Sequence, residues 1–439
     1  MPKPIIVKKK IKPFNKVITV NGDKSLSIRW ALLASQGFGK SRAYNLLKSL
    51  DVMSTLNCLK KLGTKIKFKK NFCEIQGMGL NNYIYKKKII LDAGNSGTLG
   101  RLILGLLTHS TNKIKIIGDK SLSKRDFSRV IFPLKKFGAL FKYNKNFTLP
   151  LEIIGTRNPK PIKYIETKGS AQCKSSVMLA ALNTKGETTI KAKKSRDHTE
   201  ILFKHLKIPI KVKKGKKIDI IKIKGGFQFN SINYQIPSDI SSSAFFIVLT
   251  ILSKNSKLRI KNVNINPTRI GVVTILKKMG AKITFKNKKV HNGEKVADIF
   301  IQSTNKIKAI NCPTNLNSQA IDEFLLIFLV AAKAEGISIF KDLSELNQKE
   351  SPRLKLGSKI LNLMGIKTVL TYNSIKIYGN PEIKINNRIE IKNYLKDHRI
   401  FMMSMISALT LGGHWKLHDP DSIKSSFPSF LKLINNLKK

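Results

Sequence analysis

The sequence is poor in cysteine, in tryptophan and in acidic side chains. Four of its 439 residues are cysteine, two are tryptophan, and 26 Asp and Glu stand against 82 Lys and Arg. The four cysteines (Cys58, Cys73, Cys173, Cys312) form no C-x-x-C pair and lack the spacing of a metal site. This use of cysteine argues against a disulfide-built or zinc-built fold and predicts reduced thiols.

Long hydrophobic runs are also absent. The most apolar segments, 244–252 and 324–332, are far shorter than the ~18–20 residues that a membrane-spanning helix needs. The first residues, MPKPIIVKKKIKPF, interrupt their apolar positions with Pro and Lys and resemble no secretory signal. We therefore predict a cytoplasmic protein with no membrane partner.

The formal net charge of +56 could indicate a nucleic-acid-binding protein. The lysines, however, are spread along the chain, and aromatic residues, which supply stacking platforms for bases, make up only 8%. A Lys-rich solvated surface that reflects biased composition is the favoured interpretation, and nucleic-acid binding is kept as an alternative. Either surface attracts anionic substrates.

One pattern recurs six times, at intervals of about 70 to 80 residues. Each copy begins with a polar or Gly-rich opening and continues into an apolar run of helical length. Most copies then have an amphipathic segment and a β-branched strand. The openings lie at 22–25, 95–98, 169–172, 239–242, 320–323 and 397–399.

This repeat predicts an α/β fold of two domains with three units each. The apolar runs are apolar almost all round, which is typical of buried helices, whereas 51–62, 269–279 and 353–364 have the spacing of outer amphipathic helices. Gly63, Gly280 and Gly365 follow these three segments, as expected at helix C-termini. We place the domain boundary near 234–237, and one strand near 5–20 precedes the first unit.

The polar openings can bind anions. Backbone N–H groups and the positive end of the helix dipole attract phosphate and carboxylate, although for any single opening ordinary N-capping is the more common explanation. Arginine is used sparingly, with 12 in the chain, and six lie in or after openings or in loops between units. Because only Arg grips an oxyanion bidentately, the set predicts a convergent anion site. These six are Arg29, Arg101, Arg125, Arg196, Arg353 and Arg399.

The same segments resemble the EPSP synthase family, the 3-phosphoshikimate carboxyvinyltransferases, over essentially the whole chain. The similar motifs are GDKSLSIR (22–29), GNSGTLGR (94–101), GDKSLSKR (118–125), SAQCKS (170–175), RDHTE (196–200), NPTR (266–269), IDE (321–323), KESPR (349–353) and DHR (397–399). Nine such motifs in order are a specific signal. Several have the form of the class II branch, which is associated with glyphosate tolerance.

The resemblance implies two inside-out α/β domains, each of three βαβαββ units around buried helices. The implied domains are 21–235, which mainly binds shikimate 3-phosphate, and 1–20 with 236–439. The active site would lie in the cleft between them. The expected reaction transfers the enolpyruvyl group of phosphoenolpyruvate to the 5-hydroxyl of shikimate 3-phosphate and releases phosphate, on the route to chorismate and aromatic amino acids. No metal, redox or other cofactor and no nucleic acid is implied, and we expect a monomer.

The resemblance also assigns roles to individual residues. Asp322 is the expected base for the 5-hydroxyl, and Glu350 and Lys24 handle the proton on the enolpyruvyl carbon, in an order that stays open. The residues expected to bind phosphoenolpyruvate are Lys24, Gly97, Arg125, Gln172, Arg353 and Arg399. Those expected to bind shikimate 3-phosphate are Lys24, Ser25, Arg29, Ser170, Ala171, Gln172, Arg196, Asp322 and Lys349.

Plainer interpretations exist for three of these positions. Asp322 could cap the helix that follows it, Glu350 could form an exposed ion pair with Lys349, and His398 could orient Arg399.

Four departures from the family pattern, of which Gly97 is the most informative, also stand out. Asp126 stands where Pro usually follows the loop arginine, and Pro352 stands where Asp is usual. A C-terminal lysine of the other branch has no aligned match, since Lys424 lies one position away. Gly97 predicts some glyphosate sensitivity, against the class II motifs, so tolerance stays undecided.

The nearest rival is the enolpyruvyl transferase acting on UDP-N-acetylglucosamine. That enzyme typically opens with a Lys-Asn pair and carries a reactive Cys in the loop that here spans 120–127. This chain has Lys24-Ser25 and no Cys in that loop, which favours shikimate 3-phosphate as the acceptor.

Overall fold

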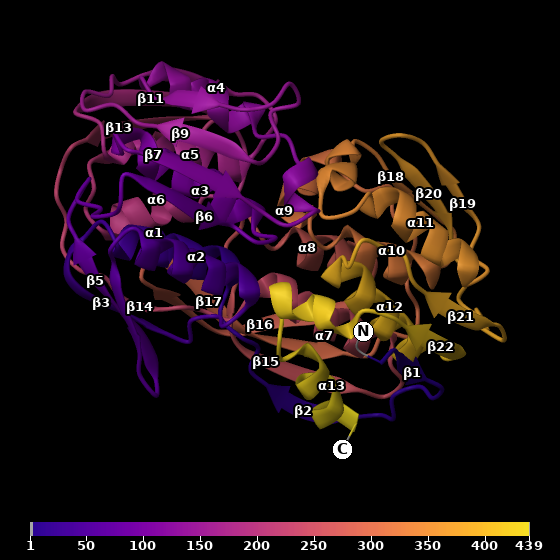
Figure 1. Cartoon of the computed structure of the whole chain (residues 1–439). Coiled ribbons are helices and arrows are strands. Elements are labelled where there is room, and N and C mark those ends of the chain that lie inside the picture. Colours follow the sequence, from indigo (N-terminus) through magenta and orange to yellow (C-terminus); the bar gives the residue numbers. More distant parts are fainter. Residues whose placement is uncertain (1–2, 439) are drawn as a thin grey trace. The chain divides into compact units, whose positions relative to one another are not determined.

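The computed structural model describes residues 3–438, which divide into two compact units (Figure 1). The N-repeat unit comprises residues 22–236 and 290–294. The C-repeat unit comprises residues 3–21, 237–289 and 295–438.

The N-repeat unit contains three four-stranded sheets. Their strand orders are β14-β3-β5-β4, β6-β7-β9-β8 and β10-β11-β13-β12. In the second sheet β6 is parallel to β7, and β9 pairs antiparallel with both β7 and β8, so that 88–154 read as one βαβαββ unit. The strands are β3 (Phe38–Tyr44), β4 (Lys65–Phe68), β5 (Phe72–Met78), β6 (Lys88–Asp92), β7 (Lys113–Ile117), β8 (Leu140–Lys142), β9 (Leu151–Ile154), β10 (Lys163–Glu166), β11 (Gly186–Lys193), β12 (Ile210–Lys213), β13 (Ile218–Gly225) and β14 (Asn233–Gln235).

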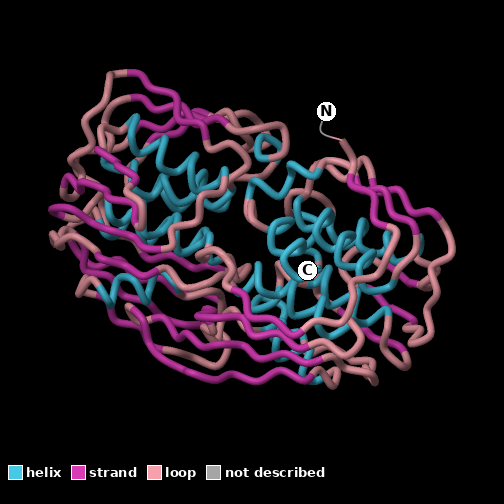
Figure 2. The backbone as a smooth tube through the Cα atoms, turned by 90° about the horizontal axis from the view of Figure 1, so that it is seen from below, coloured by secondary structure: helices cyan, strands magenta, loops and turns pink. Residues whose placement is uncertain are grey.

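The three inner helices of this unit are α1 (Lys24–Ala34), α3 (Gly97–Leu106) and α5 (Ala171–Leu182). Nearly all of their residues are buried, which follows from side chains that are apolar on every face. The outer helices α2 (Leu50–Lys61), α4 (Ser128–Lys136) and α6 (His198–His205) bury one face each. Figure 2 shows the strands on the outside of each unit and the helices within it.

The C-repeat unit repeats the plan with sheets ordered β16-β17-β15-β2, β18-β20-β19 and β1-β22-β21. Its strands after residue 21 are β15 (Lys257–Asn264), β16 (Lys282–His291), β17 (Glu294–Gln302), β18 (Ile337–Phe340), β19 (Thr368–Leu370), β20 (Ile375–Tyr378), β21 (Arg388–Ile391) and β22 (His414–Leu417). Its helices are α7 (Ile240–Leu252), α8 (Gly271–Lys278), α9 (Asn317–Ala320), α10 (Phe324–Ala332), α11 (Arg353–Leu363), α12 (His398–Leu411) and α13 (Phe430–Lys438). Of these, α7, α10 and α12 are buried along almost their whole length.

The single strand expected near 5–20 is two strands, β1 (Ile5–Val7) and β2 (Asn15–Ile18). β1 pairs antiparallel with β22, and β2 pairs parallel with β15, so the N-terminal segment completes two different sheets. Pro13, which has no backbone N–H to donate to a ladder, lies between the two strands.

The five residues 290–294 belong to the N-repeat unit, although the sequence placed them with the second domain. They form the tip of the β16–β17 hairpin, where Asn292 and Gly293 have φ of +48° and +85°, as a type I′ turn requires. The Glu294 carboxylate lies 2.6 Å from Nδ1 of His198, and both side chains are fully buried. These contacts anchor the hairpin tip to α6.

The expected outer-helix ends are confirmed. Gly63, Gly280 and Gly365 follow α2, α8 and α11 with φ of +91°, +95° and +82°, a left-handed conformation that favours Gly. In the described part of the chain, every helix is too short or too polar to cross a membrane.

Candidate active site

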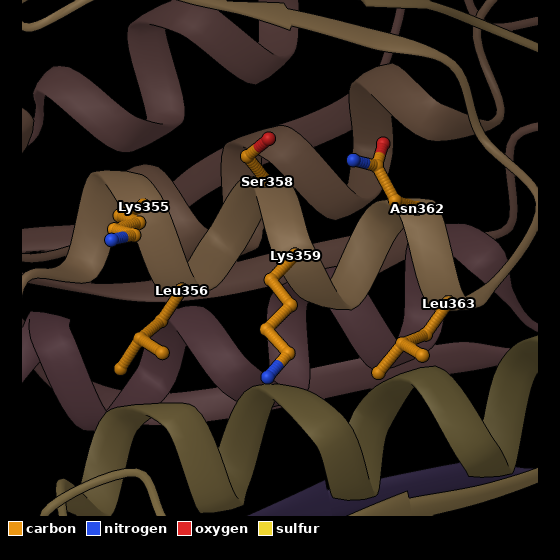
Figure 3. Close-up of a pocket in the computed structure, with 6 residues that line it drawn as sticks. All are labelled: Lys355, Leu356, Ser358, Lys359, Asn362 and Leu363. Atoms are coloured by element: carbon orange, nitrogen blue, oxygen red, sulfur yellow. The ribbon is translucent and has the colours of Figure 1, made fainter.

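A surface hollow of about 530 Å³ follows one face of α11. It is lined by Lys355, Leu356, Ser358, Lys359, Asn362 and Leu363 (Figure 3). None of these is a predicted site residue, so this hollow is not the candidate active site.

Five of the six inner helices are capped by a side chain of their own opening. Asp23, Ser96, Ser170, Asp239 and Asp397 each accept a hydrogen bond from a backbone N–H two or three residues further on. N-capping is therefore confirmed for these five residues. Of these five, only Ser170 is a predicted ligand-binding residue. The side chains of the other predicted residues are therefore not used for capping and can contact a ligand.

The sixth helix, α10, differs from the others. Glu323 is its N-cap residue and makes no capping hydrogen bond through its side chain. The Asp322 carboxylate instead lies 3.2 Å from Nζ of Lys349 and 3.6 Å from Nη1 of Arg353. The N-cap residue of α10 is thus Glu323, and the Asp322 carboxylate contacts these two cations.

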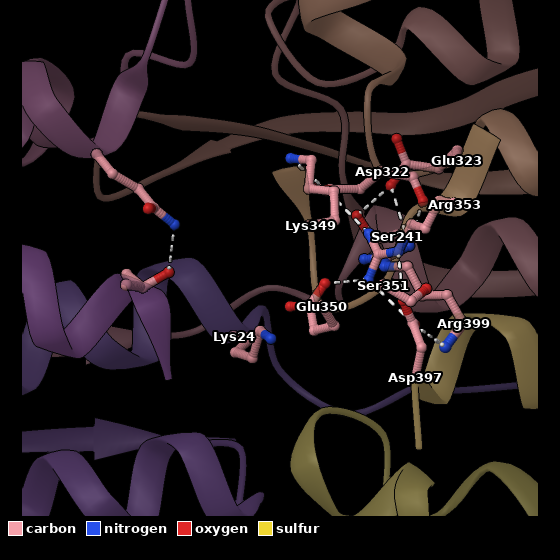
Figure 4. Close-up of polar contacts among 12 residues, drawn as sticks. Lys24, Ser241, Asp322, Glu323, Lys349, Glu350, Ser351, Arg353, Asp397 and Arg399 are labelled. Carbon is pink, nitrogen blue, oxygen red and sulfur yellow. Dashed lines mark hydrogen bonds and ion pairs between the residues drawn. The ribbon is translucent and has the colours of Figure 1, made fainter. Parts of the chain in front are cut away.

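Arg353 lies at the centre of the C-repeat cluster, which we define as Asp322, Lys349, Glu350, Arg353, Asp397 and Arg399 (Figure 4). Its Nε donates to Oδ2 of Asp397 at 2.9 Å, and its Nη2 donates to the Glu350 carboxylate. Burial alone would lower the pKa of Arg353, but the carboxylates of Asp397, Glu350 and Asp322 raise it. Burial would likewise raise the pKa of Asp397, but the charge and the hydrogen bond of Arg353, together with the nearby His398, lower it more. Both groups are therefore charged at neutral pH.

Glu350 and Lys349 do not pair with each other as an exposed ion pair. Glu350 binds the buried Arg353, and Lys349 binds Asp322. The exposed fractions of the Asp322, Glu350 and Lys349 side chains are 16%, 17% and 26%. All three side chains are therefore partly exposed, while the charges of Arg353 and Asp397 beside them are buried. Partly exposed charged groups of this kind can contact a ligand.

Arg399 lies in the first turn of α12 and faces Asp322 and Glu323. Its Nη1 donates to the backbone carbonyl of Asp322 at 2.7 Å and lies 3.6 Å from Oε1 of Glu323. The neighbouring His398 is buried, and its Nδ1 lies 3.2 Å from Oγ of Ser425. Lys424 pairs with Asp421, and its side chain is 60% exposed.

Lys24 and Arg29 occupy the first turns of α1 in the N-repeat unit. Nζ of Lys24 lies 2.9 Å from Oδ2 of Asp51 at the start of α2. Arg29 is buried, and its guanidinium donates to hydroxyls of Thr199 (2.9 Å) and Ser175 (3.1 Å). The sequence did not indicate Asp51 as the partner of Lys24. Its only signal there is that it is acidic in a chain with few acidic residues.

Gln172 is held by two partners on α3. Its Oε1 accepts from Nη1 of Arg101 at 2.8 Å, and its Nε2 donates to Oγ1 of Thr98 at 3.1 Å. Burial lowers the pKa of Arg101, which also lies over the Phe127 ring. The amide is thus oriented by the openings of α3 and α5 together.

Gly97 lies beside two guanidinium groups. A Cβ added there would lie 2.9 Å from Nη1 of Arg125 and 3.1 Å from Nη1 of Arg101. Arg125 also donates to Asn95 and Ser121, in both cases at 3.4 Å. A side chain at position 97 would therefore press on the arginines before it met any ligand.

Two residues that depart from the family pattern, Asp126 and Pro352, have local structural roles. The Asp126 carboxylate accepts hydrogen bonds from the backbone N–H and the hydroxyl of Ser128, both at 2.7 Å, at the start of α4. Its carbonyl accepts from Arg101 at 3.0 Å. The loop is therefore ordered by hydrogen bonds where Pro is usual. Pro352 precedes α11 as its N-cap residue, a place that tolerates a residue with no N–H.

The remaining predicted residues lie at the starts of α5 and α6. Ser170 and Ala171 begin α5 and are half-buried, as is Arg196, two residues before α6. Next to Arg196, the Ser195 hydroxyl is buried and has no hydrogen-bond partner among residues 3–438. Sequence reasoning missed Ser195, because a single serine carries no signal of its own.

The described residues contain no group of three or more His, Cys, Asp or Glu side chains placed to hold a metal ion. Their four cysteines are unpaired and buried, and burial raises the pKa of the Cys58 and Cys73 thiols to about 12.

The fold first defines a class of protein. The chain is similar in structure to the enolpyruvyl transferase NikO from Streptomyces tendae, with a TM-score of 0.78 over 99% of this chain and 97% of that one, at 12% identity. It is also similar to the EPSP synthase structure from Acinetobacter baumannii, with a TM-score of 0.85, 34% identity and coverage of 99% and 98%. The chain thus has the enolpyruvyl transferase fold.

Sequence comparison then gives the family. The family model for EPSP synthase (3-phosphoshikimate 1-carboxyvinyltransferase) matches residues 8–434. The 3-phosphoshikimate 1-carboxyvinyltransferase of Ruthia magnifica subsp. Calyptogena magnifica is 41% identical over 97% of both chains. That of Thermoanaerobacter sp. (strain X514) is 38% identical over 96% of this chain and 97% of the relative. The chain belongs to the EPSP synthase family.

Proposed function

We propose that this protein transfers the enolpyruvyl group of phosphoenolpyruvate to the 5-hydroxyl of shikimate 3-phosphate and releases phosphate. Family membership over almost the whole chain supports the reaction. The observation that carries the assignment is the C-repeat cluster, where a half-buried carboxylate, Asp322, lies between Lys349 and the fixed guanidinium of Arg353. This arrangement suits a base that works beside an anionic substrate.

In the proposed mechanism, Asp322 accepts the proton of the 5-hydroxyl as its oxygen attacks the central carbon of phosphoenolpyruvate. The methylene carbon of phosphoenolpyruvate gains a proton in the same phase, which forms a tetrahedral adduct. Loss of a proton from the new methyl group and departure of phosphate then restore the double bond. Glu350 and Lys24 are the groups proposed to handle the carbon-bound proton.

We propose the following contacts with the two substrates. Phosphoenolpyruvate would bind Lys24, Arg125, Gln172, Arg353 and Arg399, next to the space kept by Gly97. Shikimate 3-phosphate would bind Lys24, Ser25, Arg29, Ser170, Ala171, Gln172, Arg196, Asp322 and Lys349. We add the Ser195 hydroxyl to the phosphate contacts, because it is buried, has no hydrogen-bond partner among residues 3–438 and adjoins Arg196.

The test is an assay of phosphate release from phosphoenolpyruvate with shikimate 3-phosphate, beside a reaction with UDP-N-acetylglucosamine. Release with shikimate 3-phosphate alone, abolished by Asp322→Ala or Lys24→Met, is the expected result. Release with the nucleotide sugar alone would establish the rival activity. No release with either acceptor, from folded protein, would overturn the proposal and make a salt titration of nucleic-acid binding the next experiment.

We further propose that the protein acts in the cytoplasm as a monomer. The four unpaired cysteines favour a reducing compartment. Sedimentation of the purified protein at several concentrations tests the monomer, since a dimer would double the mass found.

A further inference from the structure

Arg269, in the Asn-Pro-Thr-Arg segment 266–269, has no role in the proposed reaction. Only 2% of its side chain is exposed, which is unusual for an arginine. Its Nη2 donates to Oγ of Ser241 in the first turn of α7 at 2.9 Å and lies 3.4 Å from Oδ1 of Asp239. A charged group is thus buried against the start of an inner helix.

The contacts continue from Ser241 to two predicted site residues. The Ser241 hydroxyl donates to Oε1 of Glu323, whose side chain is fully buried at the start of α10. The same Oε1 lies 3.6 Å from Nη1 of Arg399, which donates to the carbonyl of Asp322 at 2.7 Å. Figure 4 shows Ser241, Glu323, Asp322 and Arg399 together.

The chemistry of the hydroxyl gives this chain a direction. Ser has one proton to donate, and an arginine donor can only occupy an oxygen lone pair. With Arg269 donating to Ser241, the hydroxyl proton is directed to Glu323, which fixes the rotamer of this carboxylate. A fixed, buried carboxylate in turn restricts the long side chain of Arg399, which would otherwise lose much rotamer entropy on binding a ligand.

We infer that Arg269, Ser241 and Glu323 are positioning residues, which hold Arg399 ready to bind phosphoenolpyruvate. This inference rests on the proposed function. Because the three residues act through Arg399, their loss should weaken the binding of phosphoenolpyruvate and leave binding of shikimate 3-phosphate alone intact.

The test compares two alanine variants of α7. Ser241→Ala removes the hydroxyl that joins Arg269 to Glu323. Ser243→Ala is the matched control, because Ser243 is also buried and its hydroxyl donates only to the carbonyl of Asp239, at 2.8 Å, within the helix. Ser241→Ala should raise the KM for phosphoenolpyruvate on the order of tenfold, since small misplacements of a binding group are costly.

Calorimetry supplies the second readout, the Kd of shikimate 3-phosphate alone, which should match the wild-type value in both variants. Ser241→Thr, which keeps the hydroxyl, should restore the KM. If Ser241→Ala does not fold, Glu323→Gln takes its place in the test. This substitution keeps the size of the side chain but removes its charge, and it should also raise the KM for phosphoenolpyruvate.

Two results would overturn the inference. One is an equal effect of Ser241→Ala and Ser243→Ala. The other is a parallel loss of affinity for both substrates, which would indicate general loosening of the unit. A wild-type protein that releases no phosphate would instead refute the proposed function, so the two failures can be told apart.

Discussion

At the scale of single residues, the arginines of this lysine-rich chain are distinguished by what they contact. Arg353 binds carboxylates on two sides, Arg29 binds two hydroxyls, and Arg101 binds an amide oxygen and a backbone carbonyl. Each uses the planar fork of the guanidinium, which the single point charge of Lys cannot reproduce. These three arginines therefore lie where the direction of the donated hydrogen bonds matters as well as the charge.

Gly97 gives a prediction at this scale. In Gly97→Ala the new methyl group would lie within 3 Å of the Arg125 guanidinium, which must move. We expect the KM for phosphoenolpyruvate to rise on the order of tenfold, because the displaced guanidinium is a proposed ligand of that substrate. Steady-state kinetics at saturating shikimate 3-phosphate measure this change.

Gly100→Ala in the same helix is the control for that variant. A methyl group at position 100 would meet the Phe127 ring at 3.4 Å, which is ordinary contact. An unchanged KM in Gly97→Ala, or an equal rise in both variants, would contradict the prediction.

Asp397 gives a prediction about pH. The pKa of this buried carboxyl is lowered in the folded protein, because the charge and the hydrogen bond of Arg353, together with the nearby His398, outweigh the effect of burial. Its stabilising contribution is therefore fully present above the unfolded pKa of about 3.9 and is lost as the pH falls through the lower, folded value. Asp397→Asn should cost about 3 kcal/mol at pH 7, and this difference from wild type should shrink below pH 4.

Urea unfolding between pH 3 and pH 7 measures that difference. Asp421→Asn is the control, because Asp421 is more than half exposed and its pair with Lys424 lies on the surface. A difference for Asp397→Asn that is constant over the whole pH range would count against the assigned ion pair.

At the scale of elements, a buried contact helps to hold the tip of the β16–β17 hairpin. Glu294 at its tip and His198 at the start of α6 are both fully buried. Glu294→Ala removes the carboxylate from this pair, and we expect a loss of about 1–3 kcal/mol in the free energy of unfolding. Hydrogen exchange should also become faster at residues 290–294, since the tip loses its anchor.

The control for the hairpin is Glu335→Ala, at an exposed position in the C-repeat unit. Such surface changes usually alter stability by less than about 0.5 kcal/mol. Equal stability of the two variants would show that the hairpin does not need Glu294.

The elements also show how far the sequence alone could reach. The six inner helices and the outer-helix ends at Gly63, Gly280 and Gly365 follow from local periodicity and turn chemistry, and all are found. The Asn292-Gly293 turn was not among the predictions, and the attachment of this hairpin tip to α6 depends on a partner 96 residues away.

The same limit applies to the site. The motifs supplied Asp322, Lys349, Arg353 and Arg399, which the structure places in one cluster. They did not supply Glu323 as the partner of Ser241, which lies 82 residues away. Likewise, one N-terminal strand was expected where two complete separate sheets. Long-range pairing leaves no periodic trace in a single sequence.

At the scale of the whole molecule, repetition and charge are the dominant features. Each unit buries three inner helices behind three sheets, and a strand from a distant part of the chain completes some of those sheets, such as β14 beside β3 and β2 beside β15. The chain also carries a formal net charge of +56. Like charges this numerous oppose the compact state and attract anionic substrates at the same time.

Salt should separate these two effects. Raising sodium chloride from 10 to 150 mM shortens the Debye length from about 30 Å to about 8 Å. Repulsion between lysines then weakens, so the Tm should rise, while the attraction of phosphoenolpyruvate is screened, so its KM should rise as well. Potassium chloride must give the same shifts, because screening depends on ionic strength alone. A Tm that falls with salt would mean that specific ion pairs, such as those around Arg353, outweigh the repulsion of the whole surface.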